Sequence, residues 1–386
     1  MTLIPHRTVA SQVAQVLRVE IAKGTWRGWL PGERVLCETV QASRNTLRAA
    51  LAQLRAEGVV APSVGLGTRI VANPPAPLKR DAVKTIGVLI PEPIGRLRPL
   101  IALWIDELKD LLLAEGCRLR VYAGRQFYQV NPARNLERLV AQHGHEAWLL
   151  VRSTEAMQRW FAARNLPCLV AGSTFAEVAL PHYDLDHRSI CRHAAGVLLR
   201  MGHRRIALLN CEARLAGDVD SETGFREGVQ RSSWPEATAE VLYHRDDVAS
   251  VERALGRLLD RKHPTTGLVV SNSYAYLATT SVLAQRGLRI PRDISLISRD
   301  DDPFLGALAP APARYVVSPH AFAKKVIGSL LQLVARETFT LTPSQAMLQP
   351  KFSLGGSVAR AVNSACVGSR GLGADAAGKI EEADFV

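Results

Sequence analysis

Residues 30–60 read LPGERVLCETVQASRNTLRAALAQLRAEGVV, and their spacing predicts two helices joined by a short turn. The Pro-Gly pair at 31–32 disfavours helix, so the first helix is expected over 33–40. Ser43 is suited to cap the second helix, because a serine hydroxyl accepts from a backbone N–H two or three residues further on. Gly58 then ends this helix, since glycine readily adopts the left-handed conformation found after helix ends.

The second helix has two unlike faces. Leu47 and Leu54 recur at helical spacing on the face expected to pack inward. Arg44, Asn45 and Arg48 point the other way, among alanines small enough to let a helix enter a groove deeply. Arginine can bond guanine with two hydrogen bonds, and asparagine can pair with adenine. A solvated face is the commoner role of such residues, but the order of helices and turns favours DNA binding.

The flanking segments complete a small domain. Residues 9–21 carry apolar side chains at helical spacing, and Gly24 ends that helix. Two strands are expected at 59–61 and 68–71, joined by a tight turn at Gly65-Leu66-Gly67. Three helices followed by a hairpin indicate a winged helix-turn-helix.

Positive charge is concentrated in the same region. Residues 1–82 contain eleven Lys or Arg and five Asp or Glu, a net charge of +6. The whole chain of 386 residues has a formal net charge of +12, so about a fifth of it holds half of the excess. Such an excess favours polyanions such as nucleic acid, although many arginine-rich proteins are basic through composition alone.

Residues 30–60 and the following GLGTRIV resemble the GntR-type winged helix-turn-helix, whose pattern is LPSE-R-x-L-A, SR-x-T-V-R, AL-x-x-L-x-x-EG and a G-x-G-T wing. The resemblance implies a set of DNA-contacting residues: Arg34, Ser43, Arg44, Asn45, Thr46, Arg48, Gly65, Gly67 and Arg69. Gly32 replaces the usual Ser and removes a possible cap from the first of the two helices. Val64 and Leu66 make the wing tip apolar, so its contacts are expected from backbone amides and Arg69.

From residue 84 to about 355, short β-branched runs alternate with amphipathic helices. Strands are expected at 85–90, 118–123, 147–151, 168–171, 205–210, 239–244, 267–271 and 295–298. Helices are expected at 100–112, 132–143, 154–164, 187–201, 222–231, 250–261 and 275–286. This alternation predicts parallel sheets covered on both faces, and the two successive sets predict two lobes with a cleft between them.

Several segments of this region resemble the sensor domain of LacI-type repressors, which is shared with type I periplasmic sugar-binding proteins. They are MGHRRIALLN at 201–210, GFREGV at 224–229, RGLRIPRDISLIS at 286–298 and DDDPF at 300–304. The resemblance implies a two-lobed domain that binds a sugar. A GntR-type head joined to such a sensor resembles the arabinose-repressor subgroup.

Ligands of open α/β sheets bind beyond the carboxyl ends of the strands. Aromatic rings there can stack on a sugar, and polar side chains can bind its hydroxyl groups. These two criteria give a predicted ligand-binding set: Tyr128, Arg152, Phe175, Asn272, Tyr274 and Asp300. Asp300 also matches an Asp that the LacI-type pattern places after a strand. For each residue taken alone, packing or a solvated loop is the commoner role.

Other features narrow the class of protein. The six cysteines are too far apart for a zinc site and are expected to be reduced thiols. Neither a signal peptide nor a membrane span is indicated, so a cytoplasmic protein is expected. Catalytic and nucleotide-binding motifs are absent, so we expect no enzyme activity, no cofactor and no metal.

The expected fold class is therefore α/β, with a small N-terminal winged helix-turn-helix at 1–72 and a two-lobed, doubly wound parallel-sheet sensor at 84–355. The Pro-rich residues 73–83 are expected to be a linker, and the small and polar residues 356–386 a disordered tail. The expected function is a ligand-responsive repressor of a carbohydrate operon that binds an inverted-repeat operator in double-stranded DNA as a homodimer, with a sugar as effector. The alternative is a cytoplasmic solute-binding or sensing protein without direct operator regulation.

Overall fold

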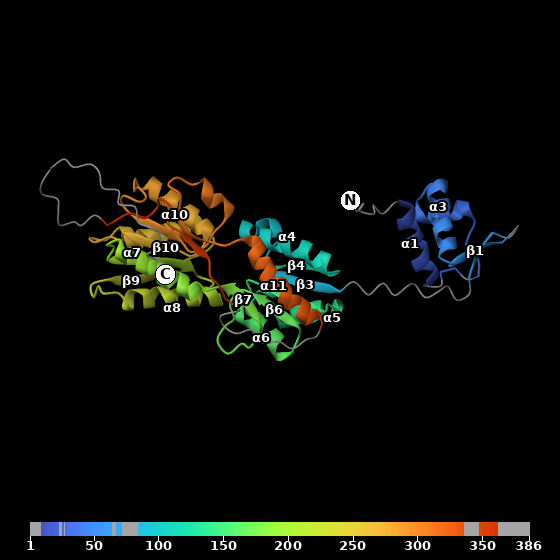
Figure 1. Ribbon diagram of the computed structural model, residues 1–386, viewed down its shortest axis with the longest axis horizontal. Helices are drawn as coiled ribbons and strands as arrows, with labels where there is room; N and C mark the ends of the chain where they lie inside the picture. The colour runs from blue at the N-terminus through green and yellow to red at the C-terminus, as the bar shows by residue number, and fades with distance from the viewer. Residues whose placement is uncertain are drawn as a thin grey trace. The chain divides into compact units, whose positions relative to one another are not determined.

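The computed structural model describes residues 9–22, 25–26, 28–63, 67–71, 84–335 and 347–361. The chain divides into two compact units, Met1–Val83 and Lys84–Val386 (Figure 1). The predicted linker and most of the predicted tail, residues 362–386, lie outside the described residues. Within the described part of the chain, no helix combines the length and the apolar character needed to cross a membrane.

The smaller unit has three helices and a hairpin in the predicted order. They are α1 (Val9–Ala22), α2 (Glu33–Val40), α3 (Arg44–Ala56), β1 (Val60–Ser63) and β2 (Gly67–Ile70). Leu17, Leu36 and Leu47, one from each helix, are buried in a shared core. The hairpin is antiparallel, and the backbone N–H of Leu30 donates to the carbonyl of Thr68 (2.9 Å). This bond ties the hairpin to the segment that leads into α2.

The larger unit consists of two lobes, each built on a six-stranded sheet (Figure 1). The first sheet has the strand order β13-β7-β6-β5-β3-β4, and all neighbouring strands are parallel. Its strands are β3 (Thr85–Ile90), β4 (Arg118–Ala123), β5 (Ala147–Val151), β6 (Cys168–Ala171), β7 (His182–Leu185) and β13 (Met347–Leu348). Helices α4 (Pro99–Ala114) and α11 (Pro319–Val334) cover one face, and α5 (Ala133–Gln142) and α6 (Glu155–Ala163) cover the other.

Alternating side chains on the central strands of the first sheet fill both of its faces. Val88 of β3 and Leu149 of β5 lie in the core beneath α4 and α11. Their neighbours Leu89 and Leu150 lie in the core beneath α5 and α6. Because successive side chains of a strand point to opposite faces, a continuous apolar run is what a sheet covered on both sides requires.

The second sheet has the strand order β14-β12-β11-β10-β8-β9, with β14 antiparallel to β12. Its strands are β8 (Arg205–Cys211), β9 (Thr238–His244), β10 (Gly267–Val270), β11 (Ser295–Ser298), β12 (Ala313–Val316) and β14 (Lys351–Ser353). Helices α7 (His187–Arg200) and α8 (Ala216–Gln230) cover one face, and α9 (Val248–Leu259) and α10 (Ser273–Gln285) cover the other. Short 3₁₀ helices lie in the loops at Ile94–Arg96, Arg125–Phe127 and Pro303–Ala307.

The two lobes are not continuous in sequence. The chain leaves the first lobe after β7, returns to it after β12 through α11 and β13, and crosses again to end the second sheet with β14. These crossings bring residues from distant parts of the chain to the boundary between the lobes. The local sequence pattern predicted neither β7 nor any element after β11.

The folded domain extends beyond the predicted end at residue 355. Ser357 is fully buried, its hydroxyl donates to the carbonyl of Leu296 (2.6 Å), and it accepts from the N–H of Ala313 (2.8 Å). The N–H of Leu296 in turn donates to the carbonyl of Ser357 (2.9 Å). Residues 356–361 therefore belong to the second lobe, and placing them in a disordered tail was wrong. Their small, polar side chains satisfy backbone groups beside β11, which composition alone does not reveal.

Candidate functional site

The exposed face of α3 is defined by how the helix begins and what it buries. The hydroxyl of Ser43 accepts from the N–H of Thr46 (3.2 Å) and lies 2.8 Å from its side-chain oxygen. Leu47 and its neighbours on the inner face are buried, whereas Arg44 and Asn45 are exposed on the first turn. By contrast, α2 begins after Gly32 without a side-chain cap. The capped end of α3 therefore presents polar donors on a helix whose opposite face is fixed in the core.

The basic side chains of this surface differ in their partners. The Arg48 guanidinium is bound to Glu33, with Nε 3.0 Å from Oε2, and Arg34 lies 3.4 Å from Glu38. Both pairs are exposed, and exposed ion pairs contribute little to stability, so a phosphate or a base can replace the carboxylates. Arg44 has no ion pair or side-chain hydrogen bond with any described residue. It is therefore available for a new contact without losing an old one.

The hairpin carries further residues that were predicted to contact DNA. Gly67 has φ +99°, a value that favours glycine, and begins β2. Arg69 is exposed on the same strand and is paired in register with Ala61. Gly65 and the apolar side chains at the predicted wing tip lie outside the described residues.

A second candidate site lies between the two lobes of the larger unit. It is a cavity of about 160 Å³ lined by residues from both lobes. Many of these residues directly follow strands β5, β6, β10 and β11: Arg152, Ser153, Gly172, Ser173, Ser271, Asn272, Arg299 and Asp300. Trp104 and Phe322, whose ring centroids are 5.1 Å apart, form part of its apolar wall. The cavity therefore occupies the place where open α/β sheets bind ligands.

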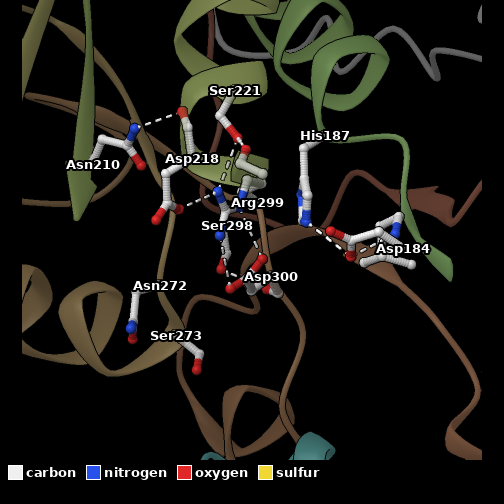
Figure 2. Close-up of polar contacts among 12 residues, drawn as sticks. Asp184, His187, Asn210, Asp218, Ser221, Asn272, Ser273, Ser298, Arg299 and Asp300 are labelled. Atoms are coloured by element: carbon white, nitrogen blue, oxygen red, sulfur yellow. Dashed lines mark hydrogen bonds and ion pairs between the residues drawn. The ribbon is translucent and has the colours of Figure 1, made fainter. Parts of the chain in front are cut away.

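A buried ion-pair network in the second lobe, shown in Figure 2, includes the lining residues Asp218, Arg299 and Asp300. The Arg299 guanidinium donates to Asp218 (3.0 Å), to Ser221 (2.8 Å) and to Asp300 (3.0 Å). Burial alone would raise the pKa of Asp300, but the guanidinium groups of Arg299 and Arg98 outweigh it and hold that pKa well below its usual range. Asp300 is therefore an ionised, fully paired carboxylate.

Two contacts at or beside this cavity join the lobes directly. Arg98, just before α4 in the first lobe, is ion-paired with Asp300 in the second. Asp302 accepts from the backbone N–H of Leu100 in the first turn of α4 (2.6 Å) and from the hydroxyl of Ser273 in its own lobe. The carboxylates that follow β11 thus hold the start of α4 against the second lobe.

A pair of residues at one crossing between the lobes, Asp184 and His187, also lines the cavity. His187 Nε2 lies 3.3 Å from a carboxylate oxygen of Asp184 (Figure 2). Ser173 donates its hydroxyl to the other carboxylate oxygen (2.8 Å). Burial would raise the pKa of Asp184, but His187 and these hydrogen bonds lower it overall. His187 Nδ1 and the hydroxyl of Ser271 are buried without a hydrogen-bond partner among the described residues. Buried polar groups are rarely left unpaired, so both atoms are candidates to bind a ligand.

Two family models match the chain. Residues 9–70 match the family described as bacterial regulatory proteins, gntR family, and residues 195–358 match the periplasmic binding protein-like domain. The chain joins a GntR-type head to a periplasmic-binding-protein-like sensor. The prediction made from the sequence motifs is confirmed for both parts.

Named relatives are transcription regulators. The chain is 27% identical over 291 residues to the arabinose metabolism transcriptional repressor of Geobacillus stearothermophilus, covering 72% of this chain and 77% of that protein. It is 24% identical over 293 residues to the HTH-type transcriptional regulator GalS of Salmonella typhimurium, covering 73% and 82%.

The sensor also resembles solved structures. A LacI family transcriptional regulator from Enterococcus faecium with bound ribose superposes with a TM-score of 0.60 at 19% identity, over 72% of this chain and 100% of that one. The transcription regulator CcpA of Lactococcus lactis gives a TM-score of 0.62 at 15% identity, over 72% and 99%. At such low identity the likeness shows the fold, and it confirms the predicted two-lobed, parallel-sheet architecture.

The structure brings together only half of the predicted ligand-binding set. Arg152, Asn272 and Asp300 line the sensor cavity, whereas the three aromatic residues do not. Tyr128 donates its hydroxyl to the carbonyl of Val151 (2.8 Å) and packs in the core under α5 and α6. A residue's position after a strand is readable from sequence, but the direction of its side chain is not.

The other two aromatic residues also lie away from the cavity. Phe175 is half-buried in the loop after β6, where its N–H donates to Gln158 (3.0 Å). Tyr274 is 47% exposed and stacks on Phe304, with ring centroids 5.3 Å apart. Neither ring is placed to stack on a ligand in this cavity.

Several cavity residues were missed by the sequence analysis. Asp184 lies in strand β7, which was not predicted. His187 begins α7, a predicted helix, but it was not included in the ligand-binding set. Asp218 lies in the first turn of α8, whose start was placed at residue 222. The signal that was available is the pair itself: a carboxylate and a histidine three residues apart, at the crossing between two predicted lobes.

Proposed function

We propose that this protein is a transcription repressor that binds operator DNA through the GntR-type head. When a small molecule occupies the sensor cavity, the affinity of the head for the operator rises or falls. The observation that carries the proposal is the combination of a capped helix with exposed Arg44, Asn45 and Arg48 and a polar cavity between two lobes. The names of the relatives, among them an arabinose metabolism repressor, support a carbohydrate effector. Such a protein acts in the cytoplasm and has no catalytic role.

The remaining details extend the same proposal. Winged heads of this kind bind as symmetric pairs, so a homodimer on an inverted-repeat operator is the simplest arrangement. Gly67 and Arg69 of the hairpin would contact the DNA next to the groove occupied by α3. Arg34, Ser43 and Thr46 would complete the contact set at the ends of α2 and α3.

The second candidate is a cytoplasmic solute-binding protein, which the cavity alone supports equally well. One measurement separates the two. Double-stranded DNA of random sequence is enriched over successive rounds for fragments that the full-length protein retains. A repressor enriches an inverted repeat, whereas a protein that only binds solutes enriches no consensus sequence, and the latter result would overturn the proposed function.

The first prediction concerns Arg44. Replacing it with Ala removes an unpaired guanidinium from the exposed first turn of α3, so specific affinity for the selected duplex should fall by about 1–3 kcal/mol, roughly 5- to 150-fold. Fluorescence anisotropy with labelled duplex measures the change. Arg55→Ala is the matched control, because it removes the same charge from the last turn of the same helix, where Arg55 is also exposed. Equal losses for both variants would contradict the assignment of Arg44 to base recognition.

A further inference from the structure

The charged residues of the sensor cavity are paired with one exception. Asp218 and Asp300 bind Arg299, Asp300 also binds Arg98, and Asp184 lies against His187. Asp301 is bound by Arg314, with Nε 2.9 Å from its carboxylate oxygen. Arg152 also lines the cavity, but it has no ion pair and no side-chain hydrogen bond with any described residue. The cavity therefore holds one half-buried positive charge that the protein itself does not neutralise.

The backbone at Arg152 is unusual as well. This residue follows the last residue of β5 with φ +53°, in the left-handed region that side chains other than glycine and asparagine rarely adopt. A strained residue that lines a cavity is a common feature of binding sites, where the surrounding structure maintains the strain. This backbone conformation is found at Arg152, whose guanidinium has no ion pair with a described residue, directly after β5 at the carboxyl ends of the strands.

Asp184, the carboxylate of the first lobe that lines the cavity, lies away from Arg152. Asp184 is at the end of β7, and β6 separates β7 from β5. Two strand spacings amount to about 10 Å, so an anionic group beside Arg152 is not forced against the Asp184 carboxylate. The Asp218 and Asp300 carboxylates are already bound by guanidinium groups.

The remaining unpaired groups suit a polyhydroxy compound. The Asn272 side-chain oxygen accepts from the N–H of Tyr274 (2.8 Å), which leaves its amide NH₂ group as a donor at the cavity. The Ser271 hydroxyl and His187 Nδ1 are buried at the cavity and have no hydrogen-bond partner in the part of the chain that the structure describes. His187 Nδ1 accepts when Nε2 donates to Asp184, so the wall offers both donors and acceptors to hydroxyl groups.

We propose that the effector is an anionic carbohydrate, a sugar acid or a sugar phosphate, whose anionic group pairs with Arg152 in the cavity. This inference rests on the proposed function and specifies the chemical class of its ligand. A guanidinium bonds a carboxylate or a phosphate through two parallel hydrogen bonds, a geometry that a neutral sugar does not offer. Arg152 is thus the residue that separates charged from neutral sugars, while Asn272, Ser271 and His187 bind the hydroxyl groups.

The test uses the full-length protein and matched sets of probes. Each set contains a neutral sugar, its acid and its phosphate: L-arabinose, L-arabinonate and L-arabinose 5-phosphate; D-ribose, D-ribonate and D-ribose 5-phosphate; D-glucose, D-gluconate and D-glucose 6-phosphate. Inorganic phosphate serves as the smallest anion. Thermal shift selects the binders, and titration calorimetry gives their dissociation constants. The acid and phosphate arms show which of the two anionic groups is recognised.

Variants assign the effect to Arg152. In the wild type, at least one acid or phosphate should bind ten times more tightly than its neutral parent. Arg152→Gln should remove that preference, and Arg152→Lys, which keeps the charge, should retain part of it. Arg118→Gln is the matched control, because Arg118 is exposed and has no ion pair with any described residue. It begins β4 and so lies at the amino end of the same sheet, away from the carboxyl ends of the strands. This variant should leave all affinities unchanged.

The outcomes are distinguishable. The inference is overturned if neutral sugars bind as tightly as their anionic counterparts, if Arg152→Gln binds the anions as the wild type does, or if no anionic probe binds. Melting curves without ligand check that Arg152→Gln is folded, and Arg152→Lys provides a second measure if it is not. Retention of the selected operator duplex by the same preparation shows separately whether the proposed function holds.

Discussion

Asp300 is almost fully buried and is bound by the guanidinium groups of both Arg299 and Arg98. Replacing it with Asn keeps the size of the side chain but leaves two guanidinium groups without this negative charge in the interior. Breaking a buried ion pair in this way costs about 3–5 kcal/mol. Because Arg299 keeps Asp218, we expect Asp300→Asn to lower the free energy of unfolding by about 3 kcal/mol, measured by urea denaturation followed by circular dichroism.

The pH dependence of stability tests the same residue. The pKa of Asp300 is lower in the folded protein than in the unfolded chain, so its stabilisation is complete above the unfolded value of about 4 and is lost as pH falls below it. The wild type should therefore lose stability on acidification more steeply than Asp300→Asn. Burial raises the pKa of Asp301 and Asp302, which act in the opposite direction in both proteins. Parallel curves would contradict the assignment.

A control variant separates this effect from a general loss of charge. Asp106 lies on the exposed side of α4, where its side chain is 73% exposed and pairs with Lys109. Asp106→Asn should change the free energy of unfolding by less than about 0.5 kcal/mol, as exposed substitutions usually do.

At the scale of elements, the contact between α7 and α8 depends on a glycine. A Cβ atom at Gly224 of α8 would lie 1.9 Å from the carbonyl oxygen of Arg188 in α7. Gly224→Ala should therefore push the helices apart and destabilise the protein by about 1–3 kcal/mol. Gly328 of α11 meets no atom within 4 Å, so Gly328→Ala should instead stabilise by about 0.5–1 kcal/mol through helix propensity. If the melting temperatures of both variants shift in the same direction, the close contact between α7 and α8 is not the reason for a glycine at position 224.

Elements with a local signal were predictable from the sequence. α2 was predicted with its observed bounds, and Ser43 was predicted as the cap that it is, because spacing and capping act within a few residues. The chain crossings after β7 and β12 were not predictable, because α11 and β13 return to the first lobe over more than 130 residues of intervening chain. Periodicity shows that a segment has an apolar face but not which distant face it meets.

The candidate ligand site shows the same division. Arg152, Asn272 and Asp300 were found because each follows a strand that was itself predictable. Asp184 and Asp218 were missed because they lie on an unpredicted strand and on a turn of α8 that is too polar to extend the apolar pattern. The sequence also did not predict the ion pairs, although these determine that Asp300 is neutralised and that Arg152 has no carboxylate partner among the described residues.

At the scale of the whole molecule, the cavity lies where the chain passes between the lobes. His187 follows the first crossing, and Pro319 and Phe322 follow the second, so three lining residues are close to segments that must bend if the lobes move. Arg98 and Leu100 meet Asp300 and Asp302 across the same boundary. A ligand that adds contacts between the lobes therefore stabilises one relative position of the lobes over others, which is the requirement for a switch.

The last prediction follows from linkage. If occupation of the cavity changes operator affinity by some factor, operator DNA must change ligand affinity by the same factor, because the two events share one thermodynamic cycle. Couplings of this kind are typically about 5- to 150-fold. The full-length protein is titrated with the tightest-binding probe, with and without saturating selected duplex, and the two ligand dissociation constants give one ratio. Titration with the duplex, with and without the probe, gives a second ratio from the DNA dissociation constants. The two ratios should be equal. In Arg44→Ala, whose specific affinity for the duplex is expected to be lower, a duplex concentration that saturates the wild type should change the ligand dissociation constant by a smaller factor. A ratio of one in both titrations of the wild type would mean that ligand binding in the sensor is not coupled to DNA binding by the head.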